Sequence, residues 1–147
     1  MDKNLVSVII PLYNTEEFVE EAVRSIMCQT LREIEIIVIN DGSTDNSLSI
    51  IKRLADEDKR IRIYTQYNQG PSVTRNKGYE YTQGKYVYFM DSDDYLEPEA
   101  LETCYIKCER QALDFVFFDA DILNKEKHKN ISLNYQRKDC TNPELVY

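Results

Sequence analysis

Hydrophobic positions along the chain switch between short apolar runs and longer segments with helical spacing. The runs are rich in β-branched residues, as expected of strands that are buried on both faces of a sheet. They lie at 5–10, 34–39, 61–64 and 86–90. A further run at 115–118 predicts a fifth strand ending at Asp119 and Asp121, and residues 131–135 fit a sixth.

The segments between these runs repeat apolar residues at the spacing of an amphipathic helix. They predict helices that start after Thr15, around 48–55, from 70 to about 81, and from 98 to about 111. Thr15 is placed to cap the first of these helices, and Gly84 to close the third. Strands that alternate with helices predict an α/β fold: a doubly wound, mostly parallel sheet with flanking helices, similar to a Rossmann fold.

Polar residues follow the predicted strands. Tyr13 follows the first, Asp41 the second, residues 91–94 the fourth, and Asp119 and Asp121 the fifth. Ligands of such sheets bind beyond the carboxyl ends of the strands. We therefore expect a binding site at this rim.

The strongest candidate for chemistry is Phe89-Met-Asp-Ser-Asp-Asp94, with three carboxylates in four residues. Like charges about 4 Å apart repel by about 1 kcal/mol in water and about 4 kcal/mol at an effective dielectric near 20. Asp91 and Asp93, two residues apart, face the same way in an extended stretch. Their oxygens suit Mg²⁺ or Mn²⁺, which share their coordination shell with substrate phosphates. A solvated loop before a helix is the alternative.

Asp41, Arg75 and Tyr13 each have a functional and a structural interpretation. Asp41 could accept hydrogen bonds from a base or ribose, or belong to an Asp-Gly turn after which Ser43 or Thr44 caps a helix. Arg75 could fork onto a diphosphate, or be a surface arginine. Tyr13 could stack on a base, or be one of 11 tyrosines without a special role. Together these residue types predict a nucleoside-diphosphate site.

Composition narrows the choice of function. A charge of -8 argues against a nucleic-acid partner. No stretch approaches the ~20 apolar residues of a membrane span, so we expect a soluble cytosolic domain. One histidine, His128, makes a Ser-His-Asp system improbable, and the four cysteines lack the spacing of a zinc site. No glycine-rich dinucleotide loop follows the first strand.

Five segments, read in order, resemble the successive motifs of glycosyltransferase family 2, whose members have the GT-A fold. They are Val6-Ser-Val-Ile-Ile-Pro-Leu-Tyr-Asn14, Ser25-Ile-Met-Cys-Gln-Thr30, Ile39-Asn-Asp-Gly-Ser-Thr-Asp45, Asn68-Gln-Gly-Pro-Ser-Val-Thr-Arg-Asn76 and Asp91-Ser-Asp-Asp94. The match extends from about Leu5 to Asp121.

The resemblance implies roles for the matching positions. Pro11 and Tyr13 would border the nucleotide base, and Asp41 would hydrogen-bond it. Arg75 would lie near the base or phosphate.

The acidic motif would hold the phosphate end of the donor. Asp91 would approach the ribose or the metal-bound phosphate, with Ser92 among the nucleotide-binding residues. Asp93, with Asp91, would ligate Mn²⁺ or Mg²⁺. The implied reaction is an inverting transfer from a nucleotide-diphosphate sugar, which we expect to be UDP-linked, to a glycan or lipid-linked hydroxyl acceptor in polysaccharide or cell-wall biosynthesis.

The end of the chain departs from the family pattern. We expect residues 1–122 to be the nucleotide-sugar-binding core and 123–147 an irregular segment at the start of a truncated acceptor-binding region. The usual catalytic base lies in a later motif, so no residue is assigned to that role. The basic stretch at 125–129 suits a solvated loop, or peripheral contact with the inner face of the membrane. A donor-binding module without transfer activity, and a nucleotidyltransferase acting on sugar phosphates, remain alternatives.

Overall fold

The computed structural model describes residues 4–118, 120–124 and 129–132. The chain forms two compact units, Met1–Leu113 and Asp114–Tyr147. The first unit contains the strands and helices that surround the predicted rim.

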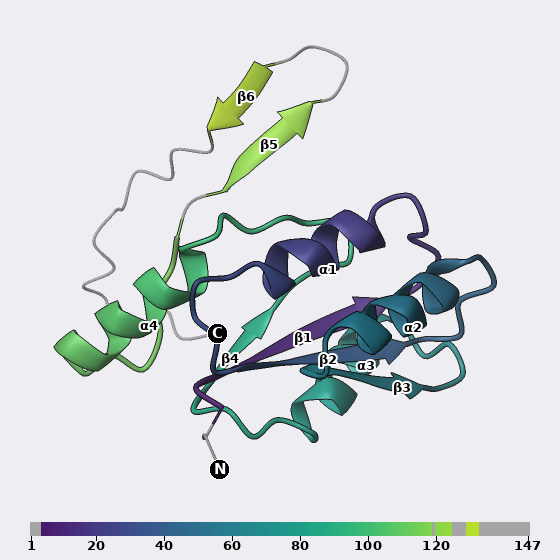
Figure 1. Ribbon diagram of the computed structural model, residues 1–147, viewed down its shortest axis with the longest axis horizontal. Coiled ribbons are helices and arrows are strands. Elements are labelled where there is room, and N and C mark those ends of the chain that lie inside the picture. The colour runs from purple at the N-terminus through teal and green to yellow at the C-terminus, as the bar shows by residue number, and fades with distance from the viewer. Residues whose placement is uncertain (1–3, 119, 125–128, 133–147) are drawn as a thin grey trace, which may run out of the picture. The chain divides into compact units, whose positions relative to one another are not determined.

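In the described part of the first unit, a four-stranded parallel sheet has the order β3-β2-β1-β4 (Figure 1). Its strands are β1 (Val6–Leu12), β2 (Ile34–Asn40), β3 (Ile61–Thr65) and β4 (Tyr86–Phe89). The helices are α1 (Val19–Met27), α2 (Ser47–Glu57), α3 (Pro71–Tyr79) and α4 (Ala100–Gln111). The predicted α/β class, with parallel strands and flanking helices, is confirmed.

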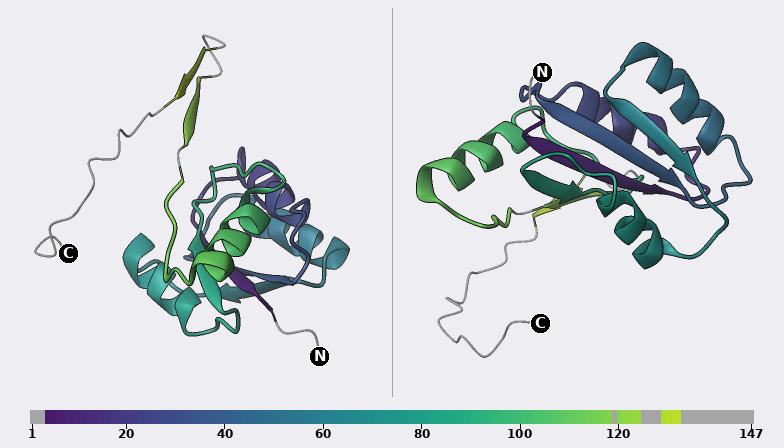
Figure 2. Two further views of the ribbon diagram at one scale, coloured as in Figure 1. Left: turned by 90° about the vertical axis from the view of Figure 1, so that its left-hand side faces the viewer. Right: turned by 90° about the horizontal axis from the view of Figure 1, so that it is seen from below.

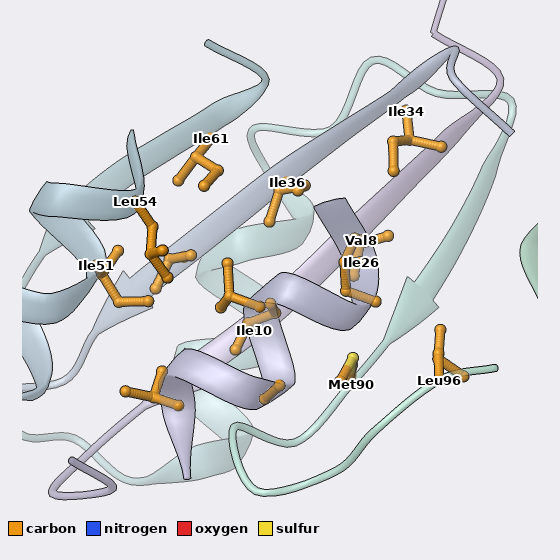
Figure 3. Close-up of a cluster of buried hydrophobic side chains, with 14 of the residues drawn as sticks. Val8, Ile10, Ile26, Ile34, Ile36, Ile51, Leu54, Ile61, Met90 and Leu96 are labelled. Carbon is orange, nitrogen blue, oxygen red and sulfur yellow. The ribbon is translucent and has the colours of Figure 1, made fainter. Parts of the chain in front are cut away.

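Helices cover both faces of the two central strands. In the right-hand view of Figure 2, α1 and α2 lie on one side of the sheet and α3 on the other. Val8 and Ile10 of β1 face the first side, where they belong to one apolar cluster with Ile26 of α1 and Ile51 of α2 (Figure 3). On the other side a Cβ added to Gly78 of α3 would lie 2.4 Å from the Ile9 side chain, so this glycine allows close packing. Burial on both faces explains the nearly continuous apolar runs.

Strand β1 continues past the predicted end at residue 10 and includes Pro11. Pairing of β1 with β4 ends at Ile9, whereas pairing with β2 continues to Leu12. The Met90 N–H bonds the Ile9 carbonyl, so odd-numbered residues of β1 present their backbone groups to β4. The Pro11 nitrogen, which has no hydrogen to donate, therefore faces the side of β4. Because pairing with β4 has already ended at Ile9, no hydrogen bond of the sheet is lost.

Two predictions about helix ends were wrong. Helix α3 ends at Tyr79, and Gly84 instead lies against β1, where a Cβ would be 2.6 Å from the Ser7 nitrogen. Helix α1 begins at Val19 without a side-chain cap. The Thr15 carbonyl accepts the first N–H bonds, while its hydroxyl bonds elsewhere.

The second unit contains an antiparallel pair, β5 (Asp121–Asn124) and β6 (Lys129–Ser132). The predicted strand at 115–118 was wrong, because these residues are in no ladder. The rings of Phe115 and Phe117 contact each other edge-on, with centroids 5.2 Å apart. Phe115 and Phe117 are 68% and 80% exposed, so this apolar run has neither the burial nor the neighbouring backbone that a strand of the sheet requires. The predicted strand at 131–135 overlaps β6 at 131–132, and Asp119, residues 125–128 and 133–147 lie outside the described residues.

Candidate functional site

A cleft of about 410 Å³ lies at the carboxyl ends of the strands. Its lining includes every residue that the sequence singled out as a site residue: Pro11, Tyr13, Asp41, Arg75, Asp91, Ser92 and Asp93. The remaining lining residues were not predicted from the sequence; they are Leu12, Asn68, Gly70, Pro71 and Thr74. The polar stretch 66–69 and the Gly-Pro pair were the signals that could have indicated this wall.

Asp41 is an anchor for the wall formed by residues 66–70. Its Oδ1 accepts hydrogen bonds from Gln66 Nε2 at 2.8 Å and the Gln69 N–H at 2.9 Å, and its Oδ2 accepts one from the Gly70 N–H at 2.9 Å. The residue is 3% exposed. Burial alone would raise the pKa of Asp41, but the hydrogen bonds outweigh burial and hold the pKa below its ordinary value. A carboxylate offers about four acceptor positions, so capacity remains on Oδ2 for one further N–H.

The turn after Asp41 is bonded to the turn after β1. Asn14, with φ of 50°, uses its Oδ1 to accept the Thr44 N–H at 2.8 Å, and its own N–H bonds the Ser43 hydroxyl at 3.3 Å. Helix α2 begins only at Ser47, so neither Ser43 nor Thr44 caps it. These bonds hold Tyr13, about half exposed, at the edge of the cleft.

Arg75 lies in α3 and reaches the acidic motif. Its Nη2 donates to Asp91 Oδ1 at 2.5 Å, and the two side chains are 34% and 54% exposed. An ion pair this exposed contributes about 0–1 kcal/mol to stability.

Negative charge concentrates around Asp91, Asp93 and Asp94. Partial desolvation, and then the charges of Asp91 and Asp93, raise the pKa of Asp94. Burial, and then the charges of Asp94 and Asp91, raise the pKa of Tyr88 to about 12. Both shifts disfavour further negative charge, so a cation at this corner would relieve the repulsion.

The donor set suits a divalent ion that a ligand helps to hold. Asp91 and Asp93 are exposed in the cleft, and within the described residues the Asp93 carboxylate forms no hydrogen bond or ion pair. The same residues contain no group of three acidic, histidine or cysteine side chains able to hold a metal ion by themselves. Mg²⁺ is commonly bound by one or two carboxylates plus substrate phosphates, so the residues fit a metal that arrives with a diphosphate.

Ser92 faces inward between the two acids. It is 5% exposed, and its Oγ accepts a hydrogen bond from the Thr15 hydroxyl at 2.9 Å. Thr15 in turn donates its N–H to the Ser47 hydroxyl at 2.9 Å. The acidic motif is thus connected to the starts of α1 and α2, a link between distant segments that no local pattern indicates.

A cleft beyond the carboxyl ends of parallel strands is the usual ligand site of open α/β sheets, including those that bind nucleotides. Residues 7–142 match the family model described as Glycosyl transferase family 2. The chain belongs to this family, and the predicted resemblance is confirmed.

Relatives and solved structures agree with this assignment. Over 103 residues the chain is 44% identical to an uncharacterized glycosyltransferase of Haemophilus influenzae, covering 69% of this chain and 41% of the relative. Over 102 residues it is 45% identical to glycosyltransferase GlyA of Streptococcus pneumoniae, and the match covers 69% of this chain and 15% of GlyA. The crystal structure of residues 1–349 of Staphylococcus aureus TarS with UDP-GlcNAc matches with a TM-score of 0.70 and 30% identity. The match covers 74% of this chain and 32% of the TarS chain.

The chain thus spans less than half the length of each of these proteins. Among the residues that the structure describes, no helix is long and apolar enough to cross a membrane.

Proposed function

We propose that this chain binds a nucleoside-diphosphate sugar, with UDP as the nucleotide, together with Mn²⁺ or Mg²⁺, and that it serves a glycosyltransferase reaction. The observation that carries the proposal is that one cleft joins a buried acceptor, Asp41, to an arginine and two exposed carboxylates. Each of these groups matches one part of such a donor: base, phosphate and metal.

The base end of the donor would lie between Tyr13 and Asp41, beside Pro11. The Asp41 carboxylate stays ionised because its pKa is lowered, and its remaining acceptor position suits the ring N–H of a pyrimidine such as uracil. Tyr13, half exposed at the edge, offers a ring face for stacking. TarS, which shares 30% identity with this chain, has been crystallised with UDP-GlcNAc, and this supports a uridine donor.

The diphosphate end would lie against Arg75 and the acidic motif. The Arg75 guanidinium, paired here with Asp91, can also donate to phosphate oxygens through its other N–H groups. Asp93 and Asp91 would hold the divalent ion. When bound, that ion supplies charge stabilisation for the departing diphosphate. Ser92, which lies between the two acids in sequence, is buried, whereas Asp91 and Asp93 are exposed.

Isothermal titration of the 147-residue chain with UDP, in Mn²⁺ and in EDTA, tests the proposal. We expect binding in Mn²⁺, much weaker binding in EDTA, and loss of the Mn²⁺ effect in Asp93→Asn. Asp56→Asn is the matched control, because Asp56 is exposed on α2 and distant in sequence from the cleft. Equal affinity with and without metal, or an Asp93→Asn variant that behaves as wild type, would contradict the proposal.

A second candidate function is donor binding without transfer by this chain alone. It is favoured by the chain's coverage of only 41% of the Haemophilus relative, which leaves most of that protein unmatched. Incubation with UDP-GlcNAc and with UDP-glucose, followed by assay of released UDP, separates the two. Metal-dependent binding without UDP release supports the second candidate, and release or transfer of sugar refutes it.

A further inference from the structure

The motif at residues 25–30 has no role in the site described above, yet two of its side chains are buried and bonded to the segment after the acidic motif. We propose that Gln29 and Ser25, at the end of α1, are positioning residues that hold residues 96–101 and thereby fix Asp91 and Asp93 for the cation. This inference rests on the proposed function, because it assigns a role within that site.

Gln29 is 0% exposed and uses its amide to join α1 to the acidic segment. Its Nε2 donates to the Glu97 carbonyl at 2.8 Å and to the Ser25 carbonyl at 3.1 Å, and its Oε1 accepts the Leu101 N–H at 3.0 Å. Both donors of the amide are therefore used. An apolar side chain in this space would leave the Glu97 carbonyl and the Leu101 N–H without these bonds, so the amide's specific contribution is to hold two backbone groups 68 and 72 residues away in sequence.

Ser25 makes a second connection. It is 6% exposed, donates its hydroxyl to the Ala22 carbonyl at 2.7 Å and accepts the Leu96 N–H at 3.1 Å. The Leu96 side chain lies in the same apolar cluster as Met90 and Ile26 (Figure 3). The backbone of Leu96 is thus bonded to α1, and its side chain is part of the apolar core.

The segment held in this way has little structure of its own. Residues 91–99 form no helix or strand, and within this stretch one backbone bond joins the Asp94 N–H to the Asp91 carbonyl. At its start, Met90 bonds β1 and Ser92 bonds Thr15; at its end, α1 provides the contacts of Ser25 and Gln29. The three acids between these points repel one another, so the connections on both sides oppose the spreading of the loop.

A consequence distinguishes this role from general stabilisation. Mg²⁺ demands near-ideal octahedral geometry, so a looser acidic loop should weaken metal-dependent binding. The base side of the cleft is held by Asp41 and the 66–70 wall, which do not contact Gln29. Metal dependence should therefore change while metal-free nucleotide affinity does not.

The variant Gln29→Glu tests the proposal, because it keeps the shape and the acceptor for Leu101 but loses the two donated bonds. Ser7→Ala is the matched control: Ser7 is also buried and bonded, to Glu35 and the Gly84 N–H, but at the other end of β1. Ser25→Ala, which removes the bond to the Leu96 N–H and the bond to the Ala22 carbonyl within α1, replaces Gln29→Glu should that variant fail to fold.

Two readouts are needed. In the ligand-free chain, hydrogen–deuterium exchange of peptides covering 91–101 should be faster in Gln29→Glu and unchanged in Ser7→Ala. The Mn²⁺ concentration that gives half-maximal UDP binding should rise by about tenfold in Gln29→Glu, and by less than about twofold in Ser7→Ala.

Unchanged exchange at 91–101, or the same shift in Mn²⁺ dependence for both variants, would overturn the inference. Absence of UDP binding by the wild-type chain would instead refute the proposed function, and the exchange measurement would still decide whether Gln29 holds the acidic segment.

Discussion

Replacement of Asp41 by asparagine removes one charge and one acceptor oxygen from a buried position where both are used. The best arrangement left to the amide keeps its oxygen at the Oδ1 position, where Gln66 and Gln69 donate. The new NH₂ group then faces the Gly70 N–H, donor against donor, in place of the bond at 2.9 Å. One charge-assisted bond is lost, and two others become neutral.

The magnitude follows from these bonds. Hydrogen bonds to a charged group contribute about 1.5–3 kcal/mol each and neutral ones about 0.5–1.5 kcal/mol. Relief of the desolvation of the charge offsets part of the loss. The pKa of Asp41 is lowered overall, so the bonds outweigh desolvation in the folded protein. We expect a loss of about 2 kcal/mol in the free energy of unfolding, which moves the urea midpoint down by about 1 M if the slope is about 2 kcal/mol/M.

The pH dependence gives an independent check. Because the folded-state pKa lies below the unfolded value of 3.8, the carboxylate contributes stability above about pH 4 and loses it as pH falls through the folded-state pKa. The difference in the free energy of unfolding between wild type and Asp41→Asn should reach its largest value at pH 7 and shrink below pH ~4.

Urea unfolding followed by circular dichroism measures the gap, with Asp56→Asn as the same chemical change on an exposed helix position. A midpoint for Asp41→Asn equal to that of Asp56→Asn would show that the bonds to Asp41 do not stabilise the fold, as would a stability difference that does not depend on pH.

Two further predictions concern the charged side of the cleft. Asp94→Asn should raise the free energy of unfolding at pH 7. The folded-state pKa of Asp94 is raised, so ionisation of this carboxyl opposes folding. The gain in stability of Asp94→Asn over wild type should therefore be absent below pH ~4 and grow as pH rises. Urea unfolding at pH 7 tests it, and a variant less stable than wild type would contradict the prediction. Arg75→Lys keeps the positive charge but loses the paired N–H donors of the guanidinium. It should weaken UDP binding in Mn²⁺ by about tenfold while changing the free energy of unfolding by less than about 1 kcal/mol. Titration and urea unfolding test it, and unchanged affinity would exclude phosphate recognition by Arg75.

The sequence supported the prediction of the sheet and its rim because those features are local. The β-branched runs of β1 and β2 are buried on both faces, and the polar residues at their ends lie at one edge because the strands are parallel. For the same reason the residues chosen at strand ends, Tyr13, Asp41 and Asp91, line one cleft.

Features that depend on contacts between distant segments could not be predicted in this way. Thr15 looks like a helix cap, but its hydroxyl bonds Ser92, 77 residues later. Gly84 looks like a helix end, but it is small because β1 passes close to it. The run at 115–118 looks like a strand, but whether an extended segment joins a sheet depends on a neighbour that its own residues do not encode.

A crystal structure of the chain with UDP and Mn²⁺, with data collected at the manganese absorption edge, shows whether Asp93 holds a metal beside the donor diphosphate. We expect one anomalous peak within coordination distance of an Asp93 carboxylate oxygen and of the diphosphate, with the uracil ring between Tyr13 and Asp41. Manganese density elsewhere, or UDP bound in the cleft with Asp93 turned to solvent and no metal beside it, would show that Asp93 does not hold the cation for the donor.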